Sequence, residues 1–184
     1  MIRKIWLAVL LVATFIGNVD VAHGGVGLWT TNGPAGEYIL ALAIDPATPT
    51  TLYAGSDGGG VFKSTTGGAS WSATNTGLPI PAYIFALAID PHTPTTLYAG
   101  GLGGVFKSTT GGASWSAINT GLTDTDFLAL AIDPHTPTTL YAGSYHGGVF
   151  KSTDGGASWS ITGLTNLDIR ALAIDPATPT TLYA

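Results

Sequence analysis

Beyond residue 24, five acidic residues occupy positions that belong to no repeated segment of this chain, and their side chains could do chemistry. They are Glu37, Asp57, Asp124, Asp126 and Asp168. Two carboxyl groups suffice for acid–base hydrolysis of a glycosidic bond, and carboxylates also accept hydrogen bonds from sugar hydroxyls or from a protein ligand. We predict that Asp124, Asp126 and Asp168 contact a ligand, because the segments that hold them vary between repeats. Ordinary turn chemistry is the competing interpretation of these acids.

The sequence does not contain the residue patterns that metal sites and other common catalytic sites require. His92 and His135 occupy the same slot of a repeated D-P-H-T-P turn, and His146 lies in a glycine-rich turn. No H-x-x-x-H or comparable ligand spacing occurs, and the chain has no cysteine, so we expect neither a metal site nor a disulfide. A Ser–His–Asp arrangement, a phosphate loop and a dinucleotide fingerprint are also unrecognisable, so no cofactor is expected.

The elements that must position these acids come from a repeat. The motif A-L-A-I-D-P-x-T-P-T-T-L-Y-A occurs four times, at intervals of 45, 43 and 42 residues. A period in the low forties without helical patterning is typical of β-propeller blades, which have four short strands each. The acid of the D-P turn recurs in every copy, so we assign it a structural role. The copies are Asp45, Asp90, Asp133 and Asp175.

One repeat shows how the strands are expected to run. The apolar run 127–132 predicts an innermost strand that is buried on both faces, with alanines on one face and Leu and Ile on the other. A D-P turn ends this strand. The second and third strands are predicted over 138–142 and 149–152, and the fourth begins at 159.

The segment 152–159, S-T-D-G-G-A-S-W, fits the pattern S-x-D-x-G-x-x-W. With the period, it makes the chain resemble the Asp-box (BNR-repeat) β-propellers, which include sialidases, xyloglucanase-type glycosidases, sortilin-like receptors and photosystem assembly propellers. The resemblance covers about residues 29–184. It implies that the Asp closes a hairpin and that the Trp packs between sheets, while Thr66 and Thr110 replace the acid in the other two loops. The implied structural residues are Ser152, Asp154, Gly156, Trp159, Trp71 and Trp115.

The repeats start and stop out of phase. Residues 29–33 match a lone fourth strand, and the last residues match the end of a second strand. We therefore expect an all-β fold with about three complete blades and partial blades at both ends. A four-blade ring would lack one third strand, so an open arc, part of a larger propeller, or chains that associate through open blade faces are the alternatives.

The amino-acid composition argues against several classes of partner and activity. Charged residues make up 9% of the chain, and beyond residue 24 four cations face ten acids, which argues against nucleic acid and anionic membranes as partners. One arginine, Arg170, remains there, whereas the resemblance to sialidases implies three. We expect a non-enzymatic scaffold or binding module for protein or polysaccharide. A fragment of a xyloglucanase-like glycoside hydrolase propeller is the alternative.

The first 24 residues are typical of a signal peptide. Arg3 and Lys4 precede an apolar core at 5–16, and small residues lead up to Gly24. This core is shorter than the roughly 20 residues of a membrane span. The sequence therefore predicts a secreted or periplasmic protein, with the propeller repeats over 25–184.

Overall fold

The computed structural model describes residues 23–24, 27–28 and 33–184, in two compact units, Met1–Thr31 and Asn32–Ala184. In the first unit, β1 (His23–Gly24) and β2 (Gly27–Leu28) form an antiparallel pair. The apolar core of the predicted signal peptide and nearly all of the strand predicted at 29–33 lie outside the described residues. No helix in the described ranges is long and apolar enough to span a membrane.

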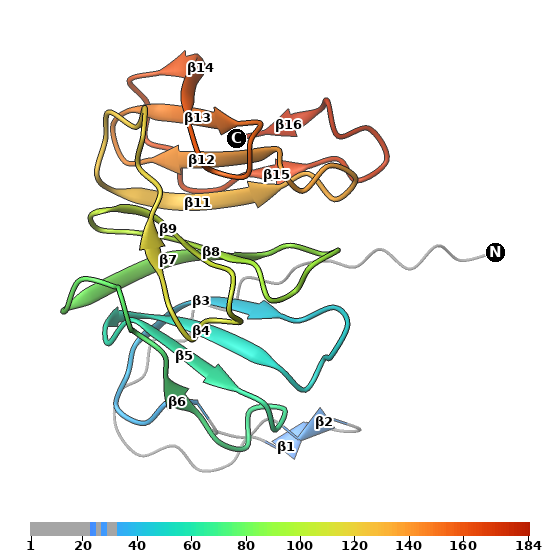
Figure 1. The fold of residues 1–184 in the computed structure, drawn as a ribbon. Helices are drawn as coiled ribbons and strands as arrows, with labels where there is room; N and C mark the ends of the chain where they lie inside the picture. Colours follow the sequence, from blue (N-terminus) through green and yellow to red (C-terminus); the bar gives the residue numbers. More distant parts are fainter. Residues whose placement is uncertain (1–22, 25–26, 29–32) are drawn as a thin grey trace. The chain divides into compact units, whose positions relative to one another are not determined.

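In the second unit, the strands of each blade pair antiparallel in chain order (Figure 1). The first blade contains β3 (Ile39–Ile44), β4 (Leu52–Gly58), β5 (Val61–Ser64) and β6 (Ser72–Ala73). The second contains β7 (Ala82–Ile89), β8 (Leu97–Gly101), β9 (Gly104–Ser108) and β10 (Ser116–Ala117). The third contains β11 (Phe127–Ile132), β12 (Leu140–Ser144), β13 (Gly148–Ser152) and β14 (Ser160–Thr165). A half-blade of β15 (Ala173–Ile174) and β16 (Leu182–Tyr183) follows.

This arrangement confirms the predicted fold class, with three four-stranded blades and part of another in the described residues. Strand β11 coincides with the predicted innermost strand, but β12 begins two residues later than predicted. The D-P turn is the reason. The Thr139 N–H donates to the carbonyl of Thr136 at 2.8 Å, and the Thr139 carbonyl accepts from Asp133 N–H at 3.0 Å, so this residue closes the turn.

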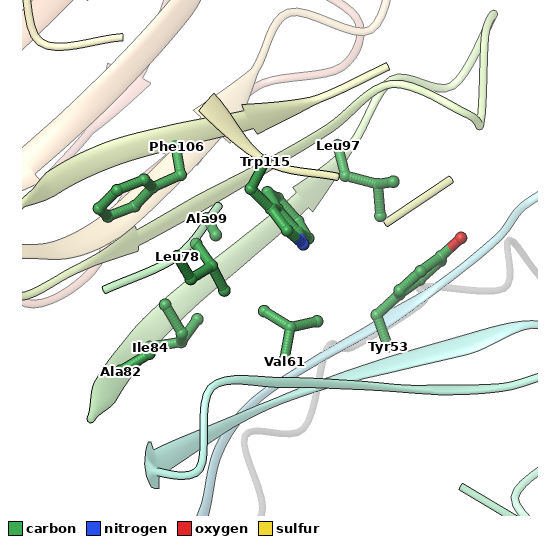
Figure 2. Packing of buried hydrophobic residues seen from close by; sticks show 9 residues of the cluster. All are labelled: Tyr53, Val61, Leu78, Ala82, Ile84, Leu97, Ala99, Phe106 and Trp115. Atoms are coloured by element: carbon green, nitrogen blue, oxygen red, sulfur yellow. The ribbon is translucent and has the colours of Figure 1, made fainter. Parts of the chain in front are cut away.

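The core lies between consecutive blades. Tyr53 and Val61 of the first blade share a buried cluster with Leu97 and Trp115 of the second, and Figure 2 shows these side chains converging. Similar clusters join the second blade to the third, and the third to the half-blade. No blade has to bury its hydrophobic residues alone, as expected for a repeat fold.

Hydrogen bonds repeat across these interfaces. The hydroxyl of Tyr53 and the ammonium of Lys63 both donate to the carbonyl of Gly111 in the next blade, at 3.1 and 2.9 Å. The same two bonds run from Tyr98 and Lys107 to the carbonyl of Gly155. The first and second blades thus each bind a glycine carbonyl in the hairpin loop that joins the third and fourth strands of the next blade.

The loops at the two ends of the blades differ in how much their sequences vary between repeats. At one end, the hairpin loops 64–71, 108–115 and 152–159 bond to the D-P turns, as where Gly155 N–H donates to the Thr138 carbonyl at 2.9 Å. At the other end, the loops that precede β7, β11 and β15 meet the loops that join second to third strands. We call this end the variable face, because its loops differ most between repeats.

Candidate functional site

Asp124 holds two loops of the variable face together. Its carboxylate accepts backbone N–H bonds from His146 at 3.0 Å and Gly147 at 2.8 Å, across the hairpin between β12 and β13. It also accepts from the N–H groups of Thr125 at 2.7 Å and Asp126 at 3.3 Å in its own loop. The carboxylate therefore fixes the position of the 144–148 loop.

These contacts set the pKa of Asp124. Burial of the carboxyl group would raise it, but hydrogen bonds from the backbone of His146, Thr125 and Asp126 and from the Ser144 side chain outweigh that effect. The pKa of Asp124 therefore lies below its usual value, because these bonds favour the charged form.

Asp126 lies at the junction of the second and third blades. Its backbone pairs with Leu102 in an isolated bridge, and its carbonyl accepts the N–H of Tyr145 at 2.9 Å. Its carboxylate accepts a hydrogen bond from the Thr125 hydroxyl at 3.0 Å. The backbone of Asp126 thus helps to position the 144–148 loop, while its half-buried side chain bonds to Thr125 in its own loop.

Asp168 lies in an exposed group of side chains. One carboxylate oxygen is 3.2 Å from Nδ1 of His146, and the other is 3.9 Å from a guanidinium nitrogen of Arg170. The Tyr145 ring lies 4.1 Å from the His146 ring, centroid to centroid, and 5.7 Å from Cζ of Arg170. We call Tyr145, His146, Asp168 and Arg170 the Tyr–Arg cluster. It combines an aromatic ring, an imidazole, a carboxylate and a guanidinium on one surface.

The structure thus links Asp124 and Asp168 through one loop, because both contact His146. Glu37 and Asp57 belong to the first blade. Asp57 pairs with Tyr83 of β7 in the second blade, and among the described contacts neither acid reaches the Tyr–Arg cluster. The five non-repeated acids therefore do not form a single site.

Three members of the Tyr–Arg cluster, Tyr145, His146 and Arg170, were not among the predicted site residues. Tyr145 falls in a turn where the second repeat has Leu102, and Arg170 replaces a residue that is apolar in the other repeats, such as Leu128. A charged residue at an otherwise apolar repeat position was the available signal.

The hairpin loops at the opposite end carry the predicted structural residues. Asp154 accepts the N–H of Ser158 at 3.0 Å and its hydroxyl at 2.6 Å, and the hydroxyl of Ser152 at 2.7 Å. The Ser152 hydroxyl accepts the Gly156 N–H at 2.9 Å, and the Trp159 indole N–H donates to the Ile118 carbonyl of the previous blade at 2.7 Å. Hydrogen bonds, led by that from the Ser158 side chain, lower the pKa of Asp154 to about 2.

The equivalent tryptophans differ from each other. Trp115 is buried and donates to the carbonyl of Thr74 in the previous blade at 2.8 Å. Trp71 is half-buried and donates to the carbonyl of Gly68 in its own loop at 3.0 Å. Among the described residues, the tryptophan is therefore more deeply buried in the blade that follows another blade.

Two surface hollows lie away from the Tyr–Arg cluster. One, of about 450 Å³, is lined mainly by the D-P turns of the first two repeats, including Asp45, Lys63 and His92. The other, of about 270 Å³, is lined by residues that include Pro34, Phe62 and Trp71. Neither contains Asp124, Asp126 or Asp168. Among the described residues, no group of three or more His, Cys, Asp or Glu could hold a metal ion.

No protein-family model matches the chain, and no curated protein matches it in sequence. Solved structures do match. An ancestral GH74 enzyme superposes with a TM-score of 0.68 over 83% of this chain and 22% of its own, at 24% identity. The fold is that of a β-propeller. The GH74 enzyme of Niastella koreensis gives a TM-score of 0.61 over 74% of this propeller chain and 24% of its own, also at 24% identity.

A third similar structure is YCF48 from Cyanidioschyzon merolae, with a TM-score of 0.54 at 16% identity. The match covers 69% of this propeller and 41% of YCF48. The propeller spans less than a quarter of the length of either GH74 enzyme. At these identities the likeness establishes the fold, and function has to be argued from the site.

Proposed function

We propose that this propeller is a non-enzymatic binding module whose variable face binds a polysaccharide. The observation that carries the proposal is the Tyr–Arg cluster of four exposed side chains, in which Tyr145 and His146 stand on a loop held by Asp124 and contact Asp168 and Arg170 of the segment before β15. An aromatic ring packs on the apolar face of a sugar, while a neighbouring carboxylate and guanidinium bond to its hydroxyls. This combination fits a sugar polymer better than an apolar protein surface.

The loop is organised in advance of binding. Four N–H groups bond to the Asp124 carboxylate, and the Asp126 carbonyl holds Tyr145 N–H. A loop that is already ordered loses little conformational entropy when a ligand binds. The site therefore has fixed geometry, although it stands on loops.

Catalysis by paired carboxyl groups is a weaker interpretation of the same residues. A general acid has to keep its proton near neutral pH, which requires a raised pKa. The pKa of Asp124 is instead lowered, and Asp168 lies 3.2 Å from Nδ1 of His146 and 3.9 Å from a guanidinium nitrogen of Arg170. The hydrolase-fragment alternative rests on the fold shared with GH74 enzymes, which leaves the reaction to be tested directly.

Isothermal titration with soluble xyloglucan, mixed-linkage β-glucan and xylan tests the proposal. We expect at least one polymer to bind, and Tyr145→Ala or Arg170→Ala to weaken it by about tenfold or more, the equivalent of about 1.4 kcal/mol. His146→Ala should also weaken binding, whereas the matched control His135→Ala, in a D-P turn at the opposite end, should not.

Two outcomes would redirect the proposal. Absence of heat with every polymer would contradict a polysaccharide ligand, and a protein ligand that depends on Tyr145 and Arg170 would take its place. Release of new reducing ends during the same incubations would contradict the non-enzymatic assignment and favour the hydrolase alternative.

We also propose that the protein is exported, on the signal-peptide pattern of residues 1–24. A polysaccharide ligand outside the cytoplasm agrees with that location. Mass spectrometry of the protein from the periplasm or medium should show a chain that begins near residue 25. Recovery of the uncleaved chain from the cytoplasm alone would contradict export.

A further inference from the structure

The hollow of about 450 Å³ lies between the first and second blades, at the end opposite the variable face. Residues of the first two D-P turns line it, together with Tyr53, Lys63 and Gly111. Its volume falls within the range of roughly 300–1,000 Å³ that is typical of small-ligand sites. Both of its walls belong to complete blades of the second unit, so the hollow is a feature of one interface within the propeller.

The positive charge in this hollow comes from Lys63, whose side chain is half-buried. Its ammonium nitrogen donates to the carbonyl of Gly111 at 2.9 Å and lies 5.3 Å from the centroid of the Tyr53 ring. In the described part of the chain, no carboxylate forms an ion pair with this lysine. An ammonium group has three N–H donors, so Lys63 can donate further hydrogen bonds to an anion.

The other polar groups of the hollow suit hydroxyl groups of a ligand. One carboxylate oxygen of Asp45 accepts the N–H groups of Ala47 at 2.8 Å and Thr48 at 3.1 Å, and no hydrogen bond to the other oxygen occurs among the described residues. The Tyr53 hydroxyl donates to a carbonyl and keeps its own lone pairs as acceptors. The exposed imidazole of His92 can donate one hydrogen bond and accept another.

The charges in the hollow restrict the ligand further. A neutral sugar would leave the Lys63 ammonium without a negative partner. A phosphate group carries close to two negative charges at neutral pH, and it would meet one ammonium group and the carboxylate of Asp45. A ligand with a single carboxylate and several hydroxyl groups matches both the charge and the hydrogen-bonding groups.

We propose that this hollow binds a sugar acid of the uronate class. The carboxylate of the ligand bonds to Lys63, and its hydroxyl groups bond to Asp45, Tyr53 and His92. The walls are ordered before binding, because the Thr51 N–H donates to the Thr48 carbonyl at 2.8 Å and holds the first D-P turn closed. The site is separate from the Tyr–Arg cluster, and it does not depend on polysaccharide binding there.

Titration of the isotope-labelled chain, followed by the NMR signals of its backbone amides, tests this site. The probes are D-glucuronate and D-galacturonate, and D-glucose is the neutral control. We expect saturable shifts of the Thr48 and Thr93 amides with at least one uronate, which weaken as salt is added, and no such shifts with D-glucose. The amide of His146 reports on the Tyr–Arg cluster, so the two sites are observed separately.

A pair of equivalent lysines gives a matched control. Lys63→Met removes the charge but keeps the apolar stem, and it should weaken uronate binding, measured at the Thr48 amide, by about tenfold or more. Lys107 donates to the Gly155 carbonyl at 2.8 Å in the same way but does not line the hollow, so Lys107→Met should leave that affinity unchanged. His92→Ala, at an exposed position, should also weaken binding at this amide. Circular dichroism checks that each variant folds.

Three results would overturn the proposal. The first is the absence of saturable shifts at Thr48 and Thr93 with both uronates. The second is an equal response of these amides to D-glucose, which would mean that the carboxylate of the ligand is not recognised. The third is a Lys63→Met chain that binds the uronate as tightly as the Lys107→Met chain.

Discussion

At the scale of single residues, the hairpin loops show how one acceptor can be replaced by another. Asp154 accepts the N–H and the hydroxyl of Ser158, and the hydroxyls of Thr66 and Thr110 take the same position in the other two loops. Thr66 accepts the N–H of Ser70 at 2.9 Å, so the loop keeps its shape without the charge. What changes is the response to pH, because only the carboxylate titrates.

We therefore expect acid to weaken one loop of the three. The pKa of Asp154 is lowered to about 2 in the folded chain, from about 3.9 in an unfolded one. A depressed pKa means that the stabilisation is complete above about pH 4 and is lost as the pH falls through about 2. Thermal melts of the unmodified chain between these pH values should fall more steeply than those of Asp154→Asn.

A reciprocal variant is the control for this effect. Thr66→Asp places the carboxylate in an equivalent loop and should make the melting temperature depend more on acid, while leaving it unchanged or raised at neutral pH. A lower melting temperature of Thr66→Asp at neutral pH would mean that the two loops are not equivalent. Equal acid dependence of Asp154→Asn and the unmodified chain would contradict the assigned role of Asp154.

At the scale of elements, the loops that lead into the inner strands depend on close backbone approach. Gly77 and Gly121 have φ of 91° and 88°, and a Cβ on either would clash with the carbonyl oxygen of Trp115 or Trp159. Gly163 occupies the same position of the third repeat, but nothing lies within 4 Å of its Cβ position. At this repeat position, the structure leaves no room for a Cβ in the first two repeats but leaves room for one in the third.

Alanine substitutions should distinguish the two closely packed glycines from the one with open space around it. Gly77→Ala and Gly121→Ala should each destabilise the fold by about 2 kcal/mol or more, because a positive φ is strained for alanine and the carbonyl has to move. Gly163→Ala should have almost no effect in the same denaturant titration. A comparable loss at Gly163 would show that its loop is packed as tightly as the others.

The elements also show how far the sequence could predict the structure. Strands followed from the repeat, since each inner strand is a continuous apolar run bounded by a D-P turn. The loop contacts did not follow, because Asp124 meets His146 across 22 residues, and His146 meets Asp168 across another 22. Such pairs depend on how two hairpins bend toward each other, which no local pattern encodes.

The outer strands illustrate the same limit. Asn75 accepts the N–H of Val61 at 2.8 Å and donates to the Gly59 carbonyl at 2.7 Å, and Asn119 repeats both bonds in the second blade. The third repeat is two residues shorter here, and β14 runs on to pair Thr165 with Gly148 instead. The Asn recurs in the first two repeats of the sequence, but its side-chain bridge appears only once the hairpin is built.

At the scale of the whole molecule, stability comes from blades that complete each other's cores. Trp115 is 4% exposed and lies in the cluster shared by the first and second blades. Trp71 occupies the same repeat position in the first blade, where it is half-buried. Comparing these two residues therefore measures what a neighbouring blade contributes.

We expect Trp115→Ala to cost about 3–5 kcal/mol, as for a large aromatic removed from a packed core, and Trp71→Ala to cost clearly less. Chemical denaturation with tryptophan fluorescence and circular dichroism measures both. Because every blade shares a cluster with its neighbour, removal of Trp115 should also uncouple the first blade from the rest, so that the two probes no longer report the same transition. Equal costs at the two positions, with a single coincident transition in both variants, would mean that the blades are stabilised within themselves rather than by contact with each other.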